Sequence, residues 1–163
     1  MNTESVPSID RLSAFPDDIL LPILSFLPTK LSVSTSILAK RWRFLWAHVP
    51  NLHFDSGYHH DSPTRLPSII PYVMSLHKVR NLHTFRLSYG YDEHLGDTWI
   101  ATAMSRNVRV LGLRLRYALP QCLFTCETLV DLKLDRCEGI PSAGVHVSWP
   151  SLKRFHYKKT ANF

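Results

Sequence analysis

Apolar side chains between residues 17 and 49 recur with helical spacing. The clearest stripe begins after Pro16-Asp17-Asp18, a combination that favours a helix start. Its members stand at i, i+1, i+4, i+5 and i+8, which marks one face of a helix; they are Ile19, Leu20, Ile23, Leu24 and Leu27. Pro28 ends this stripe, and two shorter helical patterns follow over residues 31–38 and 40–49. The pattern therefore predicts three short helices in succession.

These helices carry more apolar surface than they can bury among themselves. Three helices of this size enclose a core of about a dozen side chains, while two Trp, two Phe and the many aliphatic residues compete for it. One interpretation is a small module packed against the region that follows. The other is a docking module whose surplus apolar face belongs to a partner protein, since exposed apolar patches mark interfaces.

The second half of the chain repeats one pattern. The frame L-x-x-L-x-L, with some aromatic and β-branched substitutes, begins at Leu82, Val108, Leu129 and Leu152. These intervals lie inside the period of ~20–29 residues that leucine-rich repeats have. In each unit the two-residue alternation predicts a short strand with one buried face. Cys137 falls at the repeat position where a small side chain faces the interior.

A connector separates the two patterns. Residues 54–71 are rich in Gly, Ser, Pro and His, which is typical of turns and loops, and a helical pattern resumes from Ile69 to Leu82. A further stripe predicts a return helix; it consists of Trp99, Ile100, Ala103 and Met104. The predicted organisation is a helical module over residues 9–53, a linker and connecting helix over 54–80, and about four repeats over 81–163.

Composition argues against several classes of protein. Of 163 residues, 45% are hydrophobic, which is typical of a folded chain. No run of ~18 apolar residues exists, so no membrane is expected as a partner. Residues 1–8 resemble neither a signal nor a transit peptide, so we expect an intracellular protein of the nucleus, the cytoplasm or both. The net charge is +6, but the basic residues are scattered and lack a recognition motif, which favours solvated faces over nucleic-acid binding.

Metal sites and catalysis are disfavoured on similar grounds. The cysteines at positions 122, 126 and 137 match no disulfide framework, and a zinc site with His146 or His156 would lack a second matched pair of ligands, so we expect buried thiols. A second polar group, His53, His59, His60 and Asp61, lies in and near the connector, where ligands are rarely preorganised. The sequence has no G-x-S-x-G, P-loop, glycine-rich dinucleotide turn or H-E-x-x-H motif. No catalytic residue, metal or cofactor is predicted.

Three segments of the helical module, Phe15 to Leu20, Ile23 to Lys30 and Leu38 to Arg43, together resemble an F-box. The F-box is the motif that joins a substrate receptor to the adaptor subunit of an SCF-type (Skp-cullin-F-box) ubiquitin ligase. Pro22 departs from the family, which commonly has a polar helix former there. A proline costs ~3 kcal/mol in a helix interior and less near the start, so Pro22 is expected to weaken docking.

The resemblance extends into the repeats. Residues 97–109, 119–134 and 149–153 are similar to the plant F-box proteins with leucine-rich repeats, the F-box/FBD/LRR group. The fold that this implies is α+β: a three-helix F-box followed by a short leucine-rich-repeat solenoid with a parallel sheet. Members usually continue through further repeats and an FBD region, whereas this sequence stops at Phe163. We therefore expect a chain truncated before the FBD region, with a marginally stable last repeat.

The resemblance implies a non-catalytic receptor. Its F-box would bind a Skp-type adaptor and, through it, cullin and RING subunits, while the repeats would hold an unknown target protein near the ubiquitin carrier. An alternative is a decoy, or a gene product without a target of its own, that binds the adaptor and recruits nothing.

Candidate residues follow for both surfaces. For the adaptor we expect a face with Lys40 and Arg41 at its polar rim, some of whose apolar members instead form the module's own core; it comprises Phe15, Pro16, Ile19, Leu20, Ile23, Leu24, Leu27, Pro28, Leu38, Lys40, Arg41, Trp42 and Leu45. For the target we expect the exposed strand face, including Arg86, Arg109, Arg114, Asp131, Lys133 and Arg154.

Overall fold

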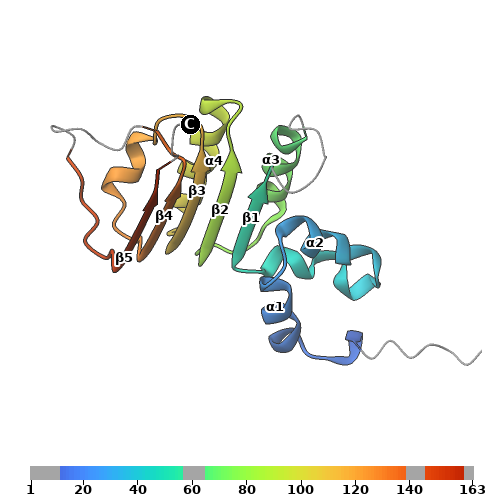
Figure 1. Ribbon diagram of the computed structural model, residues 1–163. Helices are drawn as coiled ribbons and strands as arrows, with labels where there is room; N and C mark the ends of the chain where they lie inside the picture. The colour runs from blue at the N-terminus through green and yellow to red at the C-terminus, as the bar shows by residue number, and fades with distance from the viewer. Residues whose placement is uncertain (1–11, 57–64, 139–145, 160–163) are drawn as a thin grey trace, which may run out of the picture.

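A computed structural model describes residues 12–56, 65–138 and 146–159 and combines a helical N-terminal unit with a parallel β-sheet. The unit contains η1 (Leu12–Ala14), α1 (Asp17–Ser25), α2 (Thr29–Ser34), η2 (Thr35–Ile37) and η3 (Lys40–His48), where η marks a 3-10 helix. The rest contains β1 (Asn51–Asp55), α3 (Leu66–Leu76), β2 (Thr84–Tyr89), α4 (Glu93–Ser105), β3 (Val110–Leu115), η4 (Gln121–Thr125), β4 (Asp131–Asp135) and β5 (Arg154–Lys158). In Figure 1 the helical unit extends from the β1 edge of the sheet.

The sheet has five strands in the order β1-β2-β3-β4-β5, and all neighbouring pairs are parallel. Strand order thus follows chain order, and each connection returns to the same end of the sheet before the next strand begins (Figure 1). The registers align the repeated frame: Phe85 pairs with Leu111, Leu111 with Leu132, and Leu132 with Phe155. The frames starting at residues 82, 108, 129 and 152 each contribute one strand, which confirms the strands predicted there.

Strand β1 was missed by the sequence reasoning. It pairs with β2 through Leu52 opposite Phe85 and Phe54 opposite Leu87, so it occupies the same place in the pattern. The signal is present in the sequence, because Val49-x-x-Leu52-x-Phe54 repeats the frame. It was overlooked since it lies 33 positions before Leu82, outside the expected period, and inside the segment that resembles an F-box.

One face of the sheet is buried under α3, α4 and η4. The frame residues of β1 to β4 are almost fully enclosed, together with Ile70 of α3, Ile100 of α4 and Leu123 of η4. Strand β5 differs, because Phe155 and Tyr157 at its frame positions are exposed, and Trp149 stacks against Phe155 at 5.9 Å between ring centroids. The core is therefore complete at β1 to β4 and thin at β5.

Helix α4 has clear boundary signals. The Asp92 side chain accepts a hydrogen bond from the Leu95 N–H at 3.1 Å, which caps the helix start. At the other end, Asn107 adopts a positive φ of 54°, the left-handed conformation that commonly follows a helix and that Asn tolerates. These two residues limit the return helix to the segment between β2 and β3.

Gly96 of α4 provides space for a side chain from the next repeat. A Cβ atom at this position would lie 1.7 Å from the hydroxyl oxygen of Tyr117 and 2.9 Å from its Cζ. The Tyr117 hydroxyl is buried and has no hydrogen-bond partner among the described residues, and burial raises the pKa of Tyr117 well above its usual range. Only glycine permits this contact between α4 and the segment after β3.

The predicted helix from Ile69 to Leu82 is wrong at both ends, because α3 begins at Leu66 and ends at Leu76. After Leu76 the chain is bound to the helical unit: the Lys78 N–H donates to the Ala47 carbonyl at 2.9 Å, and His77 Nε2 lies 2.8 Å from the Val49 carbonyl. These bonds stop the helix, since the backbone and ring donors of this segment find partners outside it.

The helical unit departs from the three helices expected. Its second segment divides into α2 and the 3-10 helix η2, and its third, η3, is a 3-10 helix. The division coincides with hydroxyls that bond to the backbone: Thr35 donates to the Ser32 carbonyl at 2.6 Å and Ser36 to the Val33 carbonyl at 2.6 Å. Such bonds compete with regular helix geometry.

Helix α1 begins at Asp17 with Pro16 as its N-cap residue, so Asp17 and Asp18 lie in its first turn and neither caps it. The helix continues past Pro22 to Ser25. Pro22 is thereby the sixth helical residue and is exposed, and its effect on docking stays a prediction.

Candidate functional site

The apolar residues of the helical unit divide into a core and a surface. Four of the residues expected at an adaptor face are enclosed within the unit itself, where they pack with Val49: Leu20, Leu24, Trp42 and Leu45. Trp42 is held there by a hydrogen bond from its indole Nε1 to the Ser13 hydroxyl at 2.7 Å. Because these side chains are already buried, they support the unit's shape and offer little area to a partner.

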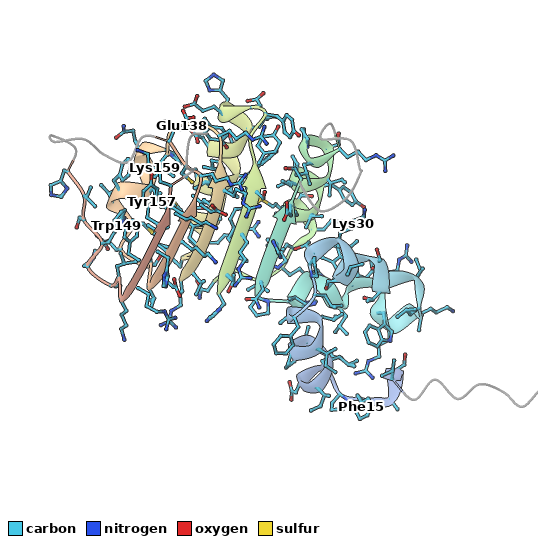
Figure 2. All side chains as sticks on the ribbon, in the orientation of Figure 1. Phe15, Lys30, Glu138, Trp149, Tyr157 and Lys159 are labelled. Atoms are coloured by element: carbon cyan, nitrogen blue, oxygen red, sulfur yellow. The ribbon has the colours of Figure 1, made fainter. Side chains whose placement is uncertain are left out.

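The remaining apolar residues of that expected face point outward. Ile19 and Ile23, one turn apart on α1, are each 48% exposed, and Leu38 is 62% exposed. Phe15 is also exposed and lies at the end of the molecule opposite Tyr157 (Figure 2). Pro16 and Pro28 are exposed, and Leu27 is half-buried against the core of the unit.

Sequence reasoning missed the two most exposed apolar side chains of this unit. Phe26 is 88% exposed and Ile37 is 87% exposed, and Leu12, Leu31 and Phe44 are exposed as well. The available signal was that Phe26 is not a member of the apolar stripe of residues 19–27, since a residue off the buried face of a helix meets solvent. Together these side chains expose far more apolar surface than the single apolar residues scattered over an ordinary protein surface.

The two residues expected at a polar rim have different surroundings. Lys40 is exposed, whereas Arg41 donates to the Asp17 carboxylate at 2.7 Å and to the Ser13 carbonyl. Arg41 therefore ties η3 to the start of α1. An exposed ion pair of this kind contributes at most ~1 kcal/mol.

The second surface is the sheet face opposite the buried one. Arg86, Arg114, Lys133 and Arg154 are exposed there, and Asp131 is half-buried beside them. Arg109 directly precedes β3, so it lies beside this face rather than on it. Five of the six residues expected at a target surface thus share one face.

Two ion pairs connect neighbouring strands on that face. Arg114 of β3 binds the Asp135 carboxylate of β4 through Nε at 2.9 Å and through Nη2 at 2.7 Å. Arg154 of β5 binds the Asp131 carboxylate of β4 at 2.8 Å. Both aspartates of β4 are therefore engaged by arginines on either side of their strand.

A shallow hollow of about 460 Å³ lies on the same face and spans β1 to β5. Its lining includes Arg86, Gly112 and Lys133, with His53 and His156 at its two ends. The pKa of His53 is lowered, first by burial and then by the nearby Arg86 cation, while Asp55 acts in the opposite direction. His53 is therefore neutral near pH 7.

Within the described ranges, no group of three or more His, Cys, Asp or Glu side chains could hold a metal ion. Cys126 and Cys137 are buried, but Cys122 is exposed, so the expectation of buried thiols is wrong for that residue. Cys137 lies inside the repeat as predicted, with its Sγ 3.5 Å from the Leu113 carbonyl. Burial raises the pKa of the Cys137 thiol, which opposes the thiolate form that zinc binds.

His59, His60 and Asp61 fall outside the described residues. Among the helices that the structure describes, none combines the length and the apolar character that a membrane span requires.

Comparison with known proteins identifies the helical unit. Residues 12–54 match the F-box domain family. The chain is 39% identical over 157 residues to an F-box/FBD/LRR-repeat protein of Arabidopsis thaliana, covering 90% of this chain and 37% of that protein. It is 40% identical over 138 residues to an FBD-associated F-box protein of the same plant, covering 78% of this chain and 34% of the relative. A second Arabidopsis F-box/FBD/LRR-repeat protein is 38% identical, with 90% of this chain and 34% of the relative covered.

The chain thus carries an F-box domain at the position that the sequence motif predicted. The resemblance to the plant F-box/LRR-repeat group is confirmed, because relatives of that group match nearly the whole chain. The chain spans about a third of the length of these curated relatives. No solved structure matches the chain significantly.

Proposed function

We propose that this protein is the substrate-recognition subunit of an SCF-type ubiquitin ligase. The F-box unit would bind a Skp-type adaptor, and through it cullin and RING subunits, while the sheet would hold a target protein. The observation that carries the proposal is that two features occur in the same segment. The residues that match the F-box family also contain nine of the fifteen exposed large hydrophobic residues of the described chain.

The sheet supports the second half of the proposal as a leucine-rich-repeat solenoid. Each repeated frame supplies one strand, the strands follow chain order, and the helices α3, α4 and η4 between them pack on the same buried face. We propose the division of the chain into an F-box over residues 9–53, a connecting segment over 54–80 and repeats over 81–163, with β1 of the F-box segment starting the sheet. No step of this function requires catalysis by this chain, because a receptor contributes proximity.

The adaptor face would consist of the exposed apolar residues and not of the buried ones. Ile19 and Ile23 of α1 and Leu38 after η2 are exposed, so a partner can bury them on docking. Complete burial of such a side chain is worth about 1.5–3 kcal/mol, so covering the exposed half of one isoleucine stabilises a complex by about 1 kcal/mol. Several such contacts are sufficient for a stable interface.

Binding of the 163-residue chain to a purified Skp-type adaptor, measured by calorimetry, tests the proposal. The variant carries Ile19→Ser and Ile23→Ser, which remove apolar area from the surface and leave the buried core of the unit unchanged. We expect binding to weaken about 30-fold, as the loss of about 1 kcal/mol from each residue, ~2 kcal/mol in all, requires. The urea midpoint should stay near that of the original chain.

Ile69→Ser is the matched control, because Ile69 is 42% exposed but belongs to α3, outside the F-box unit. This variant should bind the adaptor as the original chain does. A folded original chain that fails to bind, or equal losses in both variants, would exclude docking through α1.

A further inference from the structure

One row of side chains crosses the exposed sheet face with a gap in its centre. The registers align Arg86 of β2 with Gly112 of β3, and Gly112 with Lys133 of β4. Adjacent strands lie about 4.8 Å apart, so the backbones that carry the two cations are about 9.6 Å apart, and the residue between them has no side chain of its own. The row therefore presents one positive group on each side of a notch.

Gly112 keeps that notch open. A glycine inside a strand weakens the strand and often marks a place where another chain approaches closely. A Cβ atom at Gly112 would lie 3.2 Å from Cγ of Arg86, so the aliphatic stem of Arg86 leans over the glycine and lines the hollow. A larger side chain at position 112 would fill the hollow and displace this stem.

The charges around the notch favour an anion. Asp131 and Asp135 are on the same strand as Lys133, but Arg154 and Arg114 engage them at 2.8 and 2.7 Å. Within the part of the chain that the structure describes, no ion pair is found for Arg86 or Lys133. The lowered pKa of His53, caused in part by Arg86, agrees with a positive potential at this end of the row.

We propose that the notch at Gly112 binds a carboxylate side chain of an extended acidic peptide in the target protein, held between Arg86 and Lys133. The proposal rests on the function proposed above and specifies the chemistry of its target. A peptide is favoured over a nucleic acid because three carboxylates, those of Asp55, Asp131 and Asp135, line the same hollow and would repel a continuous phosphate backbone. A single carboxylate reaches only the central cations.

The test measures fluorescence anisotropy of a rhodamine-labelled peptide of alternating glutamate and serine against the full chain. In an extended peptide this alternation puts every carboxylate on one side. The isosteric peptide with glutamine in place of glutamate should show no measurable binding. Arg86→Gln and Lys133→Gln should each weaken binding about tenfold, equivalent to about 1.4 kcal/mol, since each removes one charged hydrogen-bond donor.

The variant Gly112→Val tests the shape of the notch without changing its charge. Valine suits a strand, so the variant should keep the fold while the filled notch abolishes binding. Arg109→Gln is the control, because it removes one exposed positive charge next to β3 and outside the hollow. It should bind the peptide as the original chain does.

Three outcomes would overturn the proposal. One is equal weakening by Arg109→Gln and Arg86→Gln, which would indicate general attraction to a basic protein. Another is unchanged binding by a folded Gly112→Val variant. The third is tighter binding of a single-stranded oligonucleotide, or of a phosphoserine peptide without glutamate, than of the glutamate peptide.

Failure of this proposal is distinguishable from failure of the proposed function. The Arg86, Lys133 and Gly112 variants should bind the Skp-type adaptor unchanged, because they are on the sheet and not on the F-box unit. Adaptor binding without peptide binding would reject the acidic target alone. Peptide binding without adaptor binding would reject the ligase role alone.

Discussion

The close contact between Gly96 and Tyr117 allows the effect of Gly96→Ala on stability to be estimated from two opposing contributions, helix propensity and overpacking. In an ordinary helix interior, Gly→Ala stabilises by about 1 kcal/mol, because alanine restricts the unfolded chain and favours the helix. At Gly96 the new Cβ would lie 1.7 Å from the Tyr117 hydroxyl oxygen, about half of an ordinary van der Waals distance. The ring must move away from the core that it packs against.

Overpacking costs about 1–3 kcal/mol, and an overlap as severe as this one belongs in the upper part of that range, about 2–3 kcal/mol. We therefore expect Gly96→Ala to lower the free energy of unfolding by about 1–2 kcal/mol and the Tm by about 2–8 °C. Tyr117→Phe alone should change stability by less than ~1 kcal/mol, because the hydroxyl that it removes has no hydrogen-bond partner among the described residues. Urea unfolding followed by circular dichroism measures both values.

The double variant decides whether the clash is the cause. In the Tyr117→Phe background the closest atom to the new Cβ is the ring carbon at 2.9 Å, so most of the overlap is relieved. Gly96→Ala should then cost at least about 1 kcal/mol less than in the original chain. A more stable Gly96→Ala variant, or an equal cost in both backgrounds, would refute the reasoning.

Two further predictions concern the F-box unit and its junction with the sheet. Burial, with a smaller effect of the Arg106 cation, lowers the pKa of His77 below its ordinary 6.5. The unfolded chain therefore binds the proton more readily, so stability should fall as the pH drops from 6.5 towards the folded-state pKa. His77→Gln should flatten this pH dependence in urea titrations, and an unchanged slope would contradict it. Leu20→Ala should lower the free energy of unfolding by about 2–5 kcal/mol, because Leu20 is fully buried; adaptor binding should then fall only in proportion to the unfolded fraction, and a stable variant with lost binding would assign Leu20 to the interface.

The sheet was largely predictable because its signal is local and repeated. Each frame has a period of two and recurs at a solenoid interval, so strand positions and buried faces follow from the sequence. The same regularity identified the exposed strand residues, including Arg86 and Lys133. The sequence did not single out Gly112, since the gap becomes visible only when the registers bring Arg86 and Lys133 to either side of it.

The F-box surface was predictable as a segment but not residue by residue. Leu20 and Ile19 are adjacent and equally apolar, yet one is fully buried and the other is 48% exposed. Sequence spacing defines an apolar stripe about as wide as a helix face, and the boundary between core and surface depends on where Trp42 and Leu45 pack. The 3-10 geometry of η3 escaped prediction for a similar reason, since spacings of three and four residues suit both helix types.

The segment η3 belongs to two cores at once. Trp42 and Leu45 pack into the F-box unit, while Trp46 and Ala47 pack into the sheet. Such a shared element leaves no pivot between the two bodies, and the hydrogen bond from the His53 N–H to Thr29 Oγ1, 2.7 Å long, reinforces the junction. In a ligase of the proposed kind, a bound target would be held in one fixed orientation relative to the adaptor. Which lysine is modified would then depend on the positions of the lysines on the target, because the sheet and the F-box unit do not rotate relative to each other.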